Sequence, residues 1–269
     1  MRPDIADIAL ADHVFAPHYA RADHAAIAAS SVMLRVAPND TAPATSQLLQ
    51  GEGFAVLDIA GRWAWGYCTH DHYVGYIMAD SLAAPIVPTH VVIAREAPLF
   101  SAPDIKSPVT RTLSLGARIA GSPEGRFLAT SDGHLHIRHI APIGTVSDDP
   151  VSIAERMLGA PYLWGGRGAG GIDCSGLIQI ALGLCGIACP RDSDQQREAL
   201  GTEIPADAPL RRGDIVFFPG HVGFMIDAAR MIHANAYWMS VTIEPLADIV
   251  ERLRPDHDQP VLARKRLNP

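Results

Sequence analysis

Residues 162–182, YLWGGRGAGGIDCSGLIQIAL, run from a glycine-rich loop directly into an apolar segment and leave few choices of fold. Gly166, Gly168 and Gly171 have the G-x-G-x-x-G spacing of a dinucleotide-binding turn, which requires a parallel sheet. The same stretch places Asp173 and Cys174 where the helix should begin, a favourable position for a reactive thiol. The segment therefore predicts either a phosphate-binding turn or a nucleophile at a helix start.

The neighbouring sequence disfavours the dinucleotide interpretation. A nucleotide-binding turn needs a buried strand before the glycines and a second, parallel strand after the helix. The segment PYLW (161–164) makes a poor buried strand, and the helix is followed by IACPRDSDQQREAL, which opens another helix. Asp192 lies at about the distance of a ribose-binding acid, but in a helix-capping sequence and not at a strand end.

The nucleophile interpretation agrees better with the local chemistry. A helix N-terminus favours negative charge, so we expect it to lower the pKa of the Cys174 thiol below its ordinary value of about 8.5. Asp173 can cap the free backbone N–H groups of the same turn. The glycine loop would let a substrate backbone approach closely. For Cys174 taken alone, a buried core thiol is the structural alternative.

Two histidines can supply the base that a cysteine nucleophile needs. His221 opens the predicted strand HVGFMI (221–226), and His233 lies 12 residues later in MIHANA (231–236). Because this separation is even, a connecting turn of odd length, such as 227–229, puts both imidazoles on one sheet face. A two-residue turn would put them on opposite faces. Gly223 shares a face with His221 and leaves room beside it.

The first half of the chain predicts strands. Residues 1–26 form an irregular or short-helical lead-in, and about 27–145 contain short strands separated by turn clusters. LRVAP (34–38) resembles LFSAP (99–103), and QLLQG (47–51) resembles TLSLG (112–116), both at an offset of 65 residues. A strand-rich repeat of this size predicts two small barrels, at 27–85 and 86–145.

From residue 146 onward the pattern changes. VSIAERML (151–158) and CSGLIQIALGLCG (174–186) predict helices, whereas GDIVFF (213–218), HVGFMI and MIHANA predict strands. Helices followed by a run of strands indicate an α+β domain at 146–269.

Composition argues against several partners. The formal net charge is −7 and the densest basic cluster is 264–266, so no nucleic-acid partner is expected. No apolar run is long enough to span a membrane, and acidic residues interrupt the first 20 residues where a signal peptide has its apolar core, so we expect a cytoplasmic protein. The four cysteines suggest no disulfide framework, and Cys185 and Cys189 favour buried thiols over a metal pair.

Four motifs carry a family resemblance over about residues 147–245: PYLWGGRG…IDCSGLIQ, PRDSDQQ, RRGDIVFF…HVGFMI and MIHANA. They resemble the NlpC-type, papain-like cell-wall peptidases. More loosely, the two N-terminal modules resemble the bacterial SH3-like domains that precede the catalytic domain in many members. The resemblance implies an α+β papain-like catalytic domain preceded by two small all-β SH3-like barrels. The whole pattern is similar to the gamma-D-glutamyl-L-diamino-acid endopeptidases (dipeptidyl-peptidase VI type), which release L-Ala-D-Glu from murein peptides.

The resemblance also implies catalytic roles. Cys174 would be the nucleophile, His221 the general base and acid, and His233 the residue that orients His221. Tyr162 matches the tyrosine that helps to polarise the scissile carbonyl, and the Cys174 backbone N–H would complete the oxyanion site. A packed aromatic ring is the structural alternative for Tyr162.

Recycling members of the family require a free N-terminal amine on L-Ala. Asp173, Ser175 and Ser193 match the residues of the amine pocket, and a partly buried ammonium does need such acceptors. Asp173 has a structural alternative as a helix cap. Ser193 with Gln196 spells a capping box, S-x-x-Q.

In the same family, a glutamate and a tyrosine of the first SH3-like domain close the amine site. Their nearest matches are Glu52 in LLQGE and Tyr73 in HYVGYI. The match departs from the usual pattern because Tyr76 stands where tryptophan is common, so Tyr67 or Tyr76 are alternative contacts.

These inferences predict a cytoplasmic cysteine endopeptidase that hydrolyses the amide between gamma-D-glutamate and a diamino acid, meso-diaminopimelate or lysine, in free murein peptides. No metal or organic cofactor is implied, and the oligomeric state stays open, with a monomer as the default. Three alternatives remain: a remodelling hydrolase of intact wall, a papain-like acyltransferase or amidase, and a non-catalytic wall-binding module.

Overall fold

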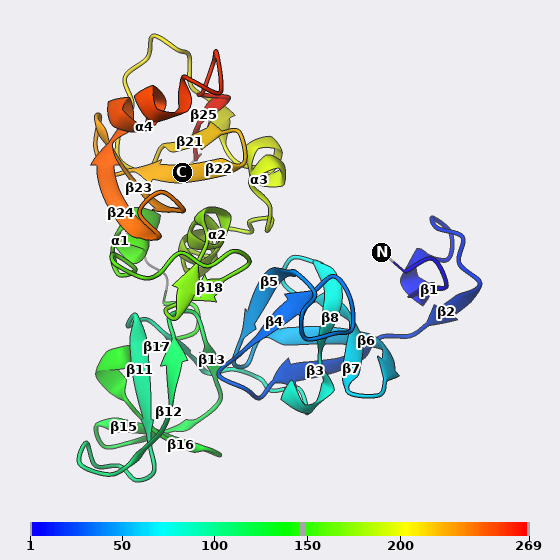
Figure 1. Cartoon of the computed structure of the whole chain (residues 1–269). Coiled ribbons are helices and arrows are strands. Elements are labelled where there is room, and N and C mark those ends of the chain that lie inside the picture. The colour runs from blue at the N-terminus through cyan, green and yellow to red at the C-terminus, as the bar shows by residue number, and fades with distance from the viewer. Residues whose placement is uncertain (1, 146–148, 268–269) are drawn as a thin grey trace. The chain divides into compact units, whose positions relative to one another are not determined.

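The structure, a computed structural model, describes residues 2–145 and 149–267 (Figure 1). Its described residues up to 145 form strands and short 3-10 helices, whereas those from 149 onward form four α-helices as well as strands. The chain divides into two units near the same point, Met1–Ile143 and Gly144–Pro269. No helix of the described residues is long and apolar enough to cross a membrane.

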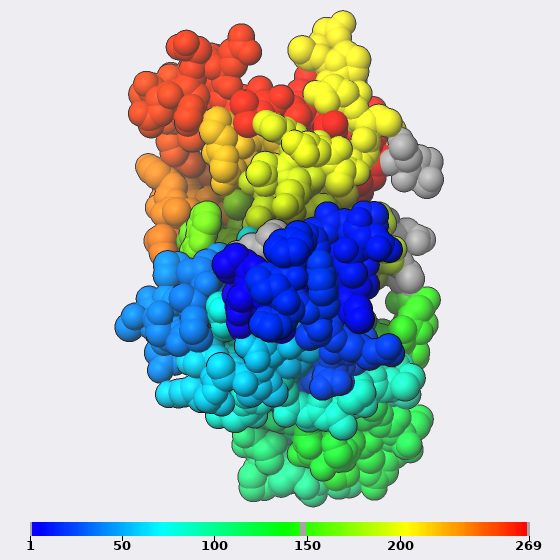
Figure 2. Space-filling model, turned by 90° about the vertical axis from the view of Figure 1, so that its right-hand side faces the viewer, coloured from blue at the N-terminus to red at the C-terminus, as the bar shows by residue number. Residues whose placement is uncertain are grey.

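The lead-in is more regular than the sequence predicts. β1 (Ile5–Asp7) pairs in parallel with β2 (His18–Ala20), and β3 (Asp23–Ile27) already belongs to the next sheet. Asp7 anchors the segment: one carboxylate oxygen accepts a bond from the Ala9 N–H (2.9 Å) and the other from the Tyr67 hydroxyl (2.7 Å). In Figure 2 the dark-blue N-terminal segment lies against the blue and cyan strands of the first β module.

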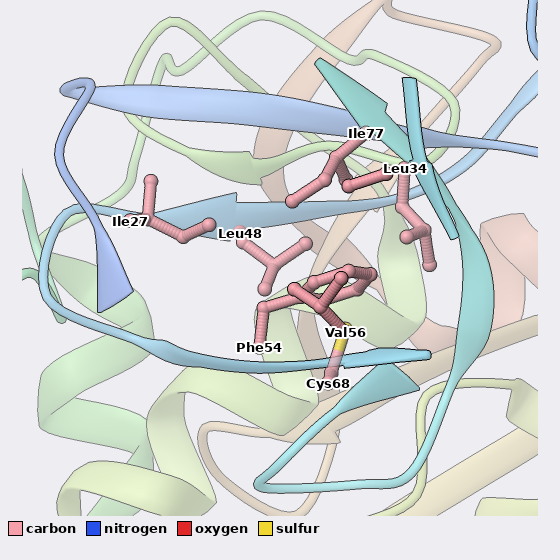
Figure 3. Close-up of a cluster of buried hydrophobic side chains, with 8 residues drawn as sticks. Ile27, Leu34, Leu48, Phe54, Val56, Cys68 and Ile77 are labelled. Carbon is pink, nitrogen blue, oxygen red and sulfur yellow. The ribbon is translucent and has the colours of Figure 1, made fainter. Parts of the chain in front are cut away.

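The first β module is a seven-stranded sheet in the order β5-β4-β8-β7-β6-β3-β9. Its further strands are β4 (Ser31–Arg35), β5 (Ala44–Leu49), β6 (Gly53–Ala60), β7 (Trp63–Cys68), β8 (Val74–Met78) and β9 (Leu82–Ala83). Figure 3 shows the core, which consists of Ile27, Leu34, Leu48, Phe54, Val56, Ala64, Cys68 and Ile77. The sheet order ends at β5 and β9 and is open, so the predicted closed barrel is not confirmed.

The second β module repeats part of this plan. Its strands are β10 (His90–Val92), β11 (Glu96–Phe100), β12 (Val109–Ser114), β13 (Arg118–Ile119), β14 (Ser122–Glu124), β15 (Phe127–Thr130), β16 (Gly133–His136) and β17 (Ile140–Pro142). They form a five-stranded sheet, β12-β11-β16-β15-β14, and a three-stranded one, β13-β10-β17. Both modules have a bulge after equivalent buried leucines, Leu34 and Leu99, which are 65 residues apart. The sequence echo therefore corresponds to a structural repeat.

The second unit is an α+β fold around a six-stranded antiparallel sheet in the order β20-β25-β21-β22-β23-β24. Its helices are α1 (Pro150–Glu155), α2 (Cys174–Leu184), α3 (Ser193–Ala199) and α4 (Leu246–Leu253). Its strands are β18 (Arg167–Gly168), β19 (Gly171–Ile172), β20 (Thr202–Glu203), β21 (Ile215–Phe218), β22 (His221–Met225), β23 (Arg230–Asn235), β24 (Ser240–Pro245) and β25 (Ala263–Arg266). The antiparallel pairing excludes the dinucleotide-binding fold, which needs parallel strands.

Helices cover both faces of this sheet (Figure 1). α2 packs against α1, β22 and β23, and α4 packs against β24. The α4 side holds an apolar cluster of Ile204, Leu210, Val216, Phe218, Met225, Met231 and Ile249. Full burial of side chains of this size contributes about 1.5–3 kcal/mol each. This packing holds the start of α2 and the strands β22 to β24 in fixed positions.

Candidate active site

Cys174 is the first residue of α2, where the sequence predicts it. Asp173 is the N-cap, and its Oδ1 accepts a bond from the Gly176 backbone N–H at 2.7 Å. The apolar face of the helix is buried through Leu177, Ile178, Ala181 and Leu182. The thiol is therefore held at the end of a helix that is anchored in the core. Its Sγ lies 4.0 Å from the Gly220 carbonyl oxygen, next to His221 in the chain.

The strand register brings the two histidines together. The Ile226 N–H bonds to the Arg230 carbonyl (2.9 Å), which leaves residues 227–229 as the turn between β22 and β23. This turn has the odd length that places His221 and His233 on one face. His221 Nε2 lies 2.7 Å from His233 Nδ1. Gly223 is opposite His233, and a Cβ at this position would lie 2.9 Å from the His233 Cβ, so a side chain there would displace the imidazole.

A carboxylate continues this chain of contacts. His233 Nε2 lies 2.7 Å from Glu244 Oε1. Arg252 of α4 donates two bonds to Glu244, at 3.1 and 2.6 Å, and the Trp238 indole N–H donates a third, at 3.2 Å. The arrangement runs from His221 through His233 to a carboxylate that accepts three further bonds.

Sequence reasoning missed Glu244 and Arg252. The signal for Glu244 is the alternation in SVTIEP (240–245), which forms β24 and pairs His233 with Thr242. In that register Thr242 and Glu244 share a face with His233. Arg252 carries no such signal, because its place depends on how α4 crosses the sheet.

Burial decides the protonation of the Cys174 thiol. It raises the pKa of the Cys174 thiol to about 11, and the nearby Asp173 carboxylate adds to this effect. Backbone N–H groups of Val222 and Ser175 and the Arg191 charge act in the opposite direction but do not overcome it. The predicted lowering of the thiol pKa is therefore wrong for the unliganded chain, because loss of water outweighs the helix N-terminus.

The imidazoles are neutral for the same reason. Loss of water, together with the neighbouring His233, lowers the pKa of His221 to about 3. Burial also lowers the pKa of His233, although the Glu244 carboxylate partly offsets this shift. At neutral pH the resting site is thus a thiol beside two neutral imidazoles, and His221 can accept a proton.

Asp173 has a larger structural role than capping. Its two oxygens accept bonds from Arg191 Nη1 (3.0 Å) and Nη2 (2.6 Å), and Oδ2 also accepts from the Gly165 N–H (2.8 Å). Arg191 Nη1 donates to the Ser175 hydroxyl as well, at 2.8 Å. All of these groups are buried. The predicted amine-pocket residues Asp173 and Ser175 therefore lie together beside Cys174, linked by an arginine that the sequence did not single out.

The glycine loop packs on itself. Residues 167–172 form the short hairpin β18–β19, and a Cβ on Gly166 would lie 2.3 Å from the Gly171 carbonyl oxygen. A Cβ on Gly171 would lie 2.4 Å from the Leu163 Cβ. These glycines thus allow a tight loop, whereas the sequence suggested that they leave room for a substrate backbone.

Tyr162 lies on the loop before this hairpin. Its backbone N–H bonds to the Met239 carbonyl (2.9 Å), and it forms a β-bridge with Ile172, two residues before the nucleophile. The residue is half-buried. Burial raises the pKa of its hydroxyl to about 12, and the negative charges of Cys174 and Asp173 add to the rise. Tyr162 therefore stays protonated near the thiol and can donate a hydrogen bond.

The third predicted amine-pocket residue is Ser193, on α3. Ser193 is the first residue of α3, and the N-cap is Asp192, so the predicted capping box is wrong. Gln196 instead donates to the carbonyls of Ser175 (3.0 Å) and Pro190 (2.8 Å).

Glu52 and Tyr73 belong to the first unit. Glu52 is buried and accepts a bond from the Leu49 N–H at 2.8 Å, and Tyr73 packs against the core of the first β module. Contact of either residue with a substrate stays a prediction.

Two family models match the chain. Residues 159–250, which contain Tyr162, Cys174, His221 and His233, match the NlpC/P60 family. Residues 34–82 match the bacterial dipeptidyl-peptidase Sh3 domain. The second match covers the end of β4 and all of β5 to β8 of the first β module.

Curated relatives agree with these matches. The chain is 38% identical over 99 residues to a probable endopeptidase of Mycobacterium bovis, a match covering 36% of this chain and 25% of that protein. It is 31% identical over 112 residues to the gamma-D-glutamyl-L-lysine dipeptidyl-peptidase of Bacillus subtilis, covering 39% and 37%. It is 34% identical over 99 residues to dipeptidyl-peptidase 6 of Lysinibacillus sphaericus, covering 37% and 36%. The matched region thus spans well under half of each of these relatives.

A solved structure matches over most of the chain. It is an NlpC/P60 family protein from Bacillus cereus, with a TM-score of 0.76 and 22% identity, and the match covers 92% of this chain and all of that chain. At this identity the likeness shows a shared fold. Together with the family matches, it shows that this chain carries an NlpC/P60 family domain, preceded in the sequence by a bacterial dipeptidyl-peptidase SH3 domain.

Proposed function

We propose that this chain is a cysteine peptidase that hydrolyses the amide bond between gamma-D-glutamate and a diamino acid in murein peptides with a free N-terminal L-Ala. The observation that carries the proposal is the contact of His221 with His233 beside Cys174 at the start of α2, within the NlpC/P60 match. The names of the Bacillus subtilis and Lysinibacillus sphaericus relatives support the substrate class.

In the acylation step, Cys174 Sγ attacks the carbonyl carbon while its proton passes to neutral His221. A thiol with a raised pKa favours this coupled transfer over a preformed thiolate. The Cys174 backbone N–H stands at the first position of α2, where helix N–H groups lack an intrahelical acceptor. It can therefore bind the developing oxyanion, together with the Tyr162 hydroxyl.

Collapse of this intermediate breaks the carbon–nitrogen bond. His221 gives its proton to the leaving amine of the diamino acid, and the L-Ala-gamma-D-Glu acyl group stays on Cys174 as a thioester. His221 then takes a proton from water, which attacks the thioester and releases the dipeptide. Cys174 regains its proton, so the cycle is balanced without a cofactor.

The free amine of L-Ala gives the proposed specificity. Asp173, Ser175 and Ser193 would accept its hydrogen bonds. Because the Asp173 carboxylate already binds Arg191, the ammonium would share it and rely on the serine hydroxyls for the remaining bonds. A requirement for a free amine suits short peptides released from the wall, so we place the reaction in cytoplasmic peptide recycling.

Mass spectrometry of defined peptides tests the proposal. The substrates are L-Ala-gamma-D-Glu-meso-diaminopimelate and its L-Lys analogue, each with a free and an N-acetylated amine, and the control is Cys174→Ala. We expect cleavage of a free-amine peptide, no cleavage of the acetylated form, and loss of activity in the control. Cleavage of no peptide would contradict the proposal.

A second candidate is endopeptidase activity on intact wall. Several curated relatives carry the name probable endopeptidase, which favours it. This candidate predicts equal cleavage of the free and acetylated peptides and release of soluble fragments from purified sacculi.

A further inference from the structure

We propose that Glu244 is a positioning residue that fixes the hydrogen positions of both active-site histidines through its ionised carboxylate. The inference rests on the proposed function and deepens it, because it assigns the group that prepares His221 to act as a base. It follows from the order of contacts from Glu244 to His233 and from His233 to His221.

The argument begins at the carboxylate. An ionised carboxylate can only accept hydrogen bonds, so the nitrogen of His233 that faces it, Nε2, must carry the hydrogen. The Asn235 amide nitrogen lies 3.2 Å from the same Nε2, but its two hydrogens have acceptors in Thr242 Oγ1 (2.8 Å) and the Ser240 carbonyl (3.5 Å). A neutral imidazole has one N–H, so Nδ1 of His233 is left as an acceptor. Glu244 is ionised near neutral pH, since the bonds from Arg252, Trp238 and His233 lower its pKa to about 2 despite burial.

The same rule then sets His221. Its Nε2 lies 2.7 Å from His233 Nδ1, which is an acceptor, so His221 Nε2 must donate and carry the hydrogen. The lone pair of His221 is therefore on Nδ1, the ring nitrogen nearer to its own backbone. That backbone borders the thiol, since the Cys174 Sγ contacts the Gly220 carbonyl. One fixed carboxylate thus leaves His221 with its basic nitrogen available to Cys174.

Charge adds a second effect. The groups around the imidazoles come from several elements: Cys174 on α2, Glu244 on β24, Arg252 on α4, and Asp173, Arg191 and Tyr162 beside the thiol. Glu244 raises the pKa of His221, whereas Arg252 lowers it. Glu244 and Arg252 therefore shift the pKa of His221 in opposite directions. A purely structural role of the ion pair would not give opposite shifts when either partner is replaced.

Matched variants use this opposition. Glu244→Gln keeps the shape of the side chain, but its amide can donate to His233 Nε2. The hydrogens of His233 and His221 would then move to the opposite ring nitrogens. We expect kcat to fall roughly 10- to 100-fold with KM changed by less than about 3-fold, and the acid limb of the kcat/KM profile to move to lower pH. Arg252→Gln keeps the carboxylate, so kcat changes by less than about 3-fold and the acid limb moves to higher pH. Glu244→Asp should restore part of the rate.

A readout that needs no substrate separates this inference from the proposed function. Alkylation of Cys174 by iodoacetamide at neutral pH, quantified on the Cys174 peptide by mass spectrometry, should slow by roughly 10-fold in Glu244→Gln and hardly change in Arg252→Gln. The wild type could show no peptide cleavage while the alkylation rates still follow the expected order. That result would contradict the proposed substrate but support the positioning role of Glu244. Equal behaviour of the two variants in rate and pH profile would overturn the positioning role, with or without cleavage.

The wild-type chain allows a direct check that does not depend on the folding of a variant. Nitrogen-15 chemical shifts of the imidazoles, assigned with His221→Gln and His233→Gln, distinguish the two tautomers. We expect the hydrogen on Nε2 in both histidines at neutral pH. A hydrogen on Nδ1 of either histidine would overturn the inference.

Discussion

Two carboxylate–arginine pairs flank the reactive groups and differ in what else they hold. In the Asp173–Arg191 pair the side chains are 7% and 1% exposed, and the remaining partners of Asp173 include the backbone N–H groups of Gly165 and Gly176. In the Glu244–Arg252 pair they are 10% and 27% exposed. There the remaining partners of Glu244 are His233 and Trp238.

The two carboxylates differ in the groups that they hold in place. Asp173 fixes peptide groups, so it holds the loop and the helix start that carry the thiol. Glu244 contacts an imidazole, so its charge acts on titrating side chains. The same chemical pair thus holds backbone groups at one place and a histidine at the other.

Removing each carboxylate should separate these roles, with the largest effect at the buried pair. Asp173→Ala leaves Arg191 buried without its partner and removes the cap of α2, so the free energy of unfolding should fall by about 3–5 kcal/mol. Glu244→Ala leaves Arg252 with access to water, and the loss should be about 1–2 kcal/mol. Urea unfolding followed by helical circular dichroism measures this, because the described α-helices all lie in the second unit. Equal losses would contradict the comparison.

The second-largest effect should come from acid, which lowers the free energy of unfolding through His221. The pKa of His221 falls from an ordinary 6.5 to about 3 on folding, so its contribution to stability is present above pH 6.5 and is lost as the pH falls toward 3. Between about pH 6.5 and pH 5, one such group removes on the order of 2 kcal/mol. Urea unfolding at several pH values in this range measures the slope. The matched variant His221→Gln should show a smaller slope, and an unchanged one would contradict this assignment.

The smallest expected effect on stability comes from an exposed ion pair. Glu251 and Arg254 on and beside α4 are 74% and 64% exposed and lie 2.9 Å apart. Because water screens them, Arg254→Ala should change the free energy of unfolding by less than about 0.5 kcal/mol. A loss above about 1 kcal/mol in the free energy of unfolding would mean that burial does not decide how much each ion pair contributes to stability.

Local rules predicted the placement of Cys174, His221 and His233. Asp173 and Cys174 stand at a helix start because a capping side chain precedes a run of apolar residues. The shared face of His221 and His233 followed from an even separation and an odd turn, both readable from the sequence. The 65-residue echo predicted two strand-rich modules, and the structure adds that both have a bulge after the equivalent leucines.

The rest depends on tertiary contacts. The direction of the Cys174 pKa shift is set by how completely the protein encloses the sulfur, which no local pattern reports. Arg191 reaches Asp173 across 18 residues, and Arg252 reaches Glu244 from a helix that the sequence did not predict. Gly166 and Gly171 allow their loop to pack on itself, a role that composition does not distinguish from the approach of a ligand backbone.

The central claim is that Cys174 forms a covalent acyl intermediate with the L-Ala-gamma-D-Glu portion of the substrate. Acid quenching during turnover, followed by intact-protein mass spectrometry and peptide mapping, tests it most directly. The account predicts a dipeptide thioester on the peptide that contains Cys174, absent from Cys174→Ala and accumulating when the water step is slowed. Turnover with no adduct, or with an adduct on another residue, would contradict the account.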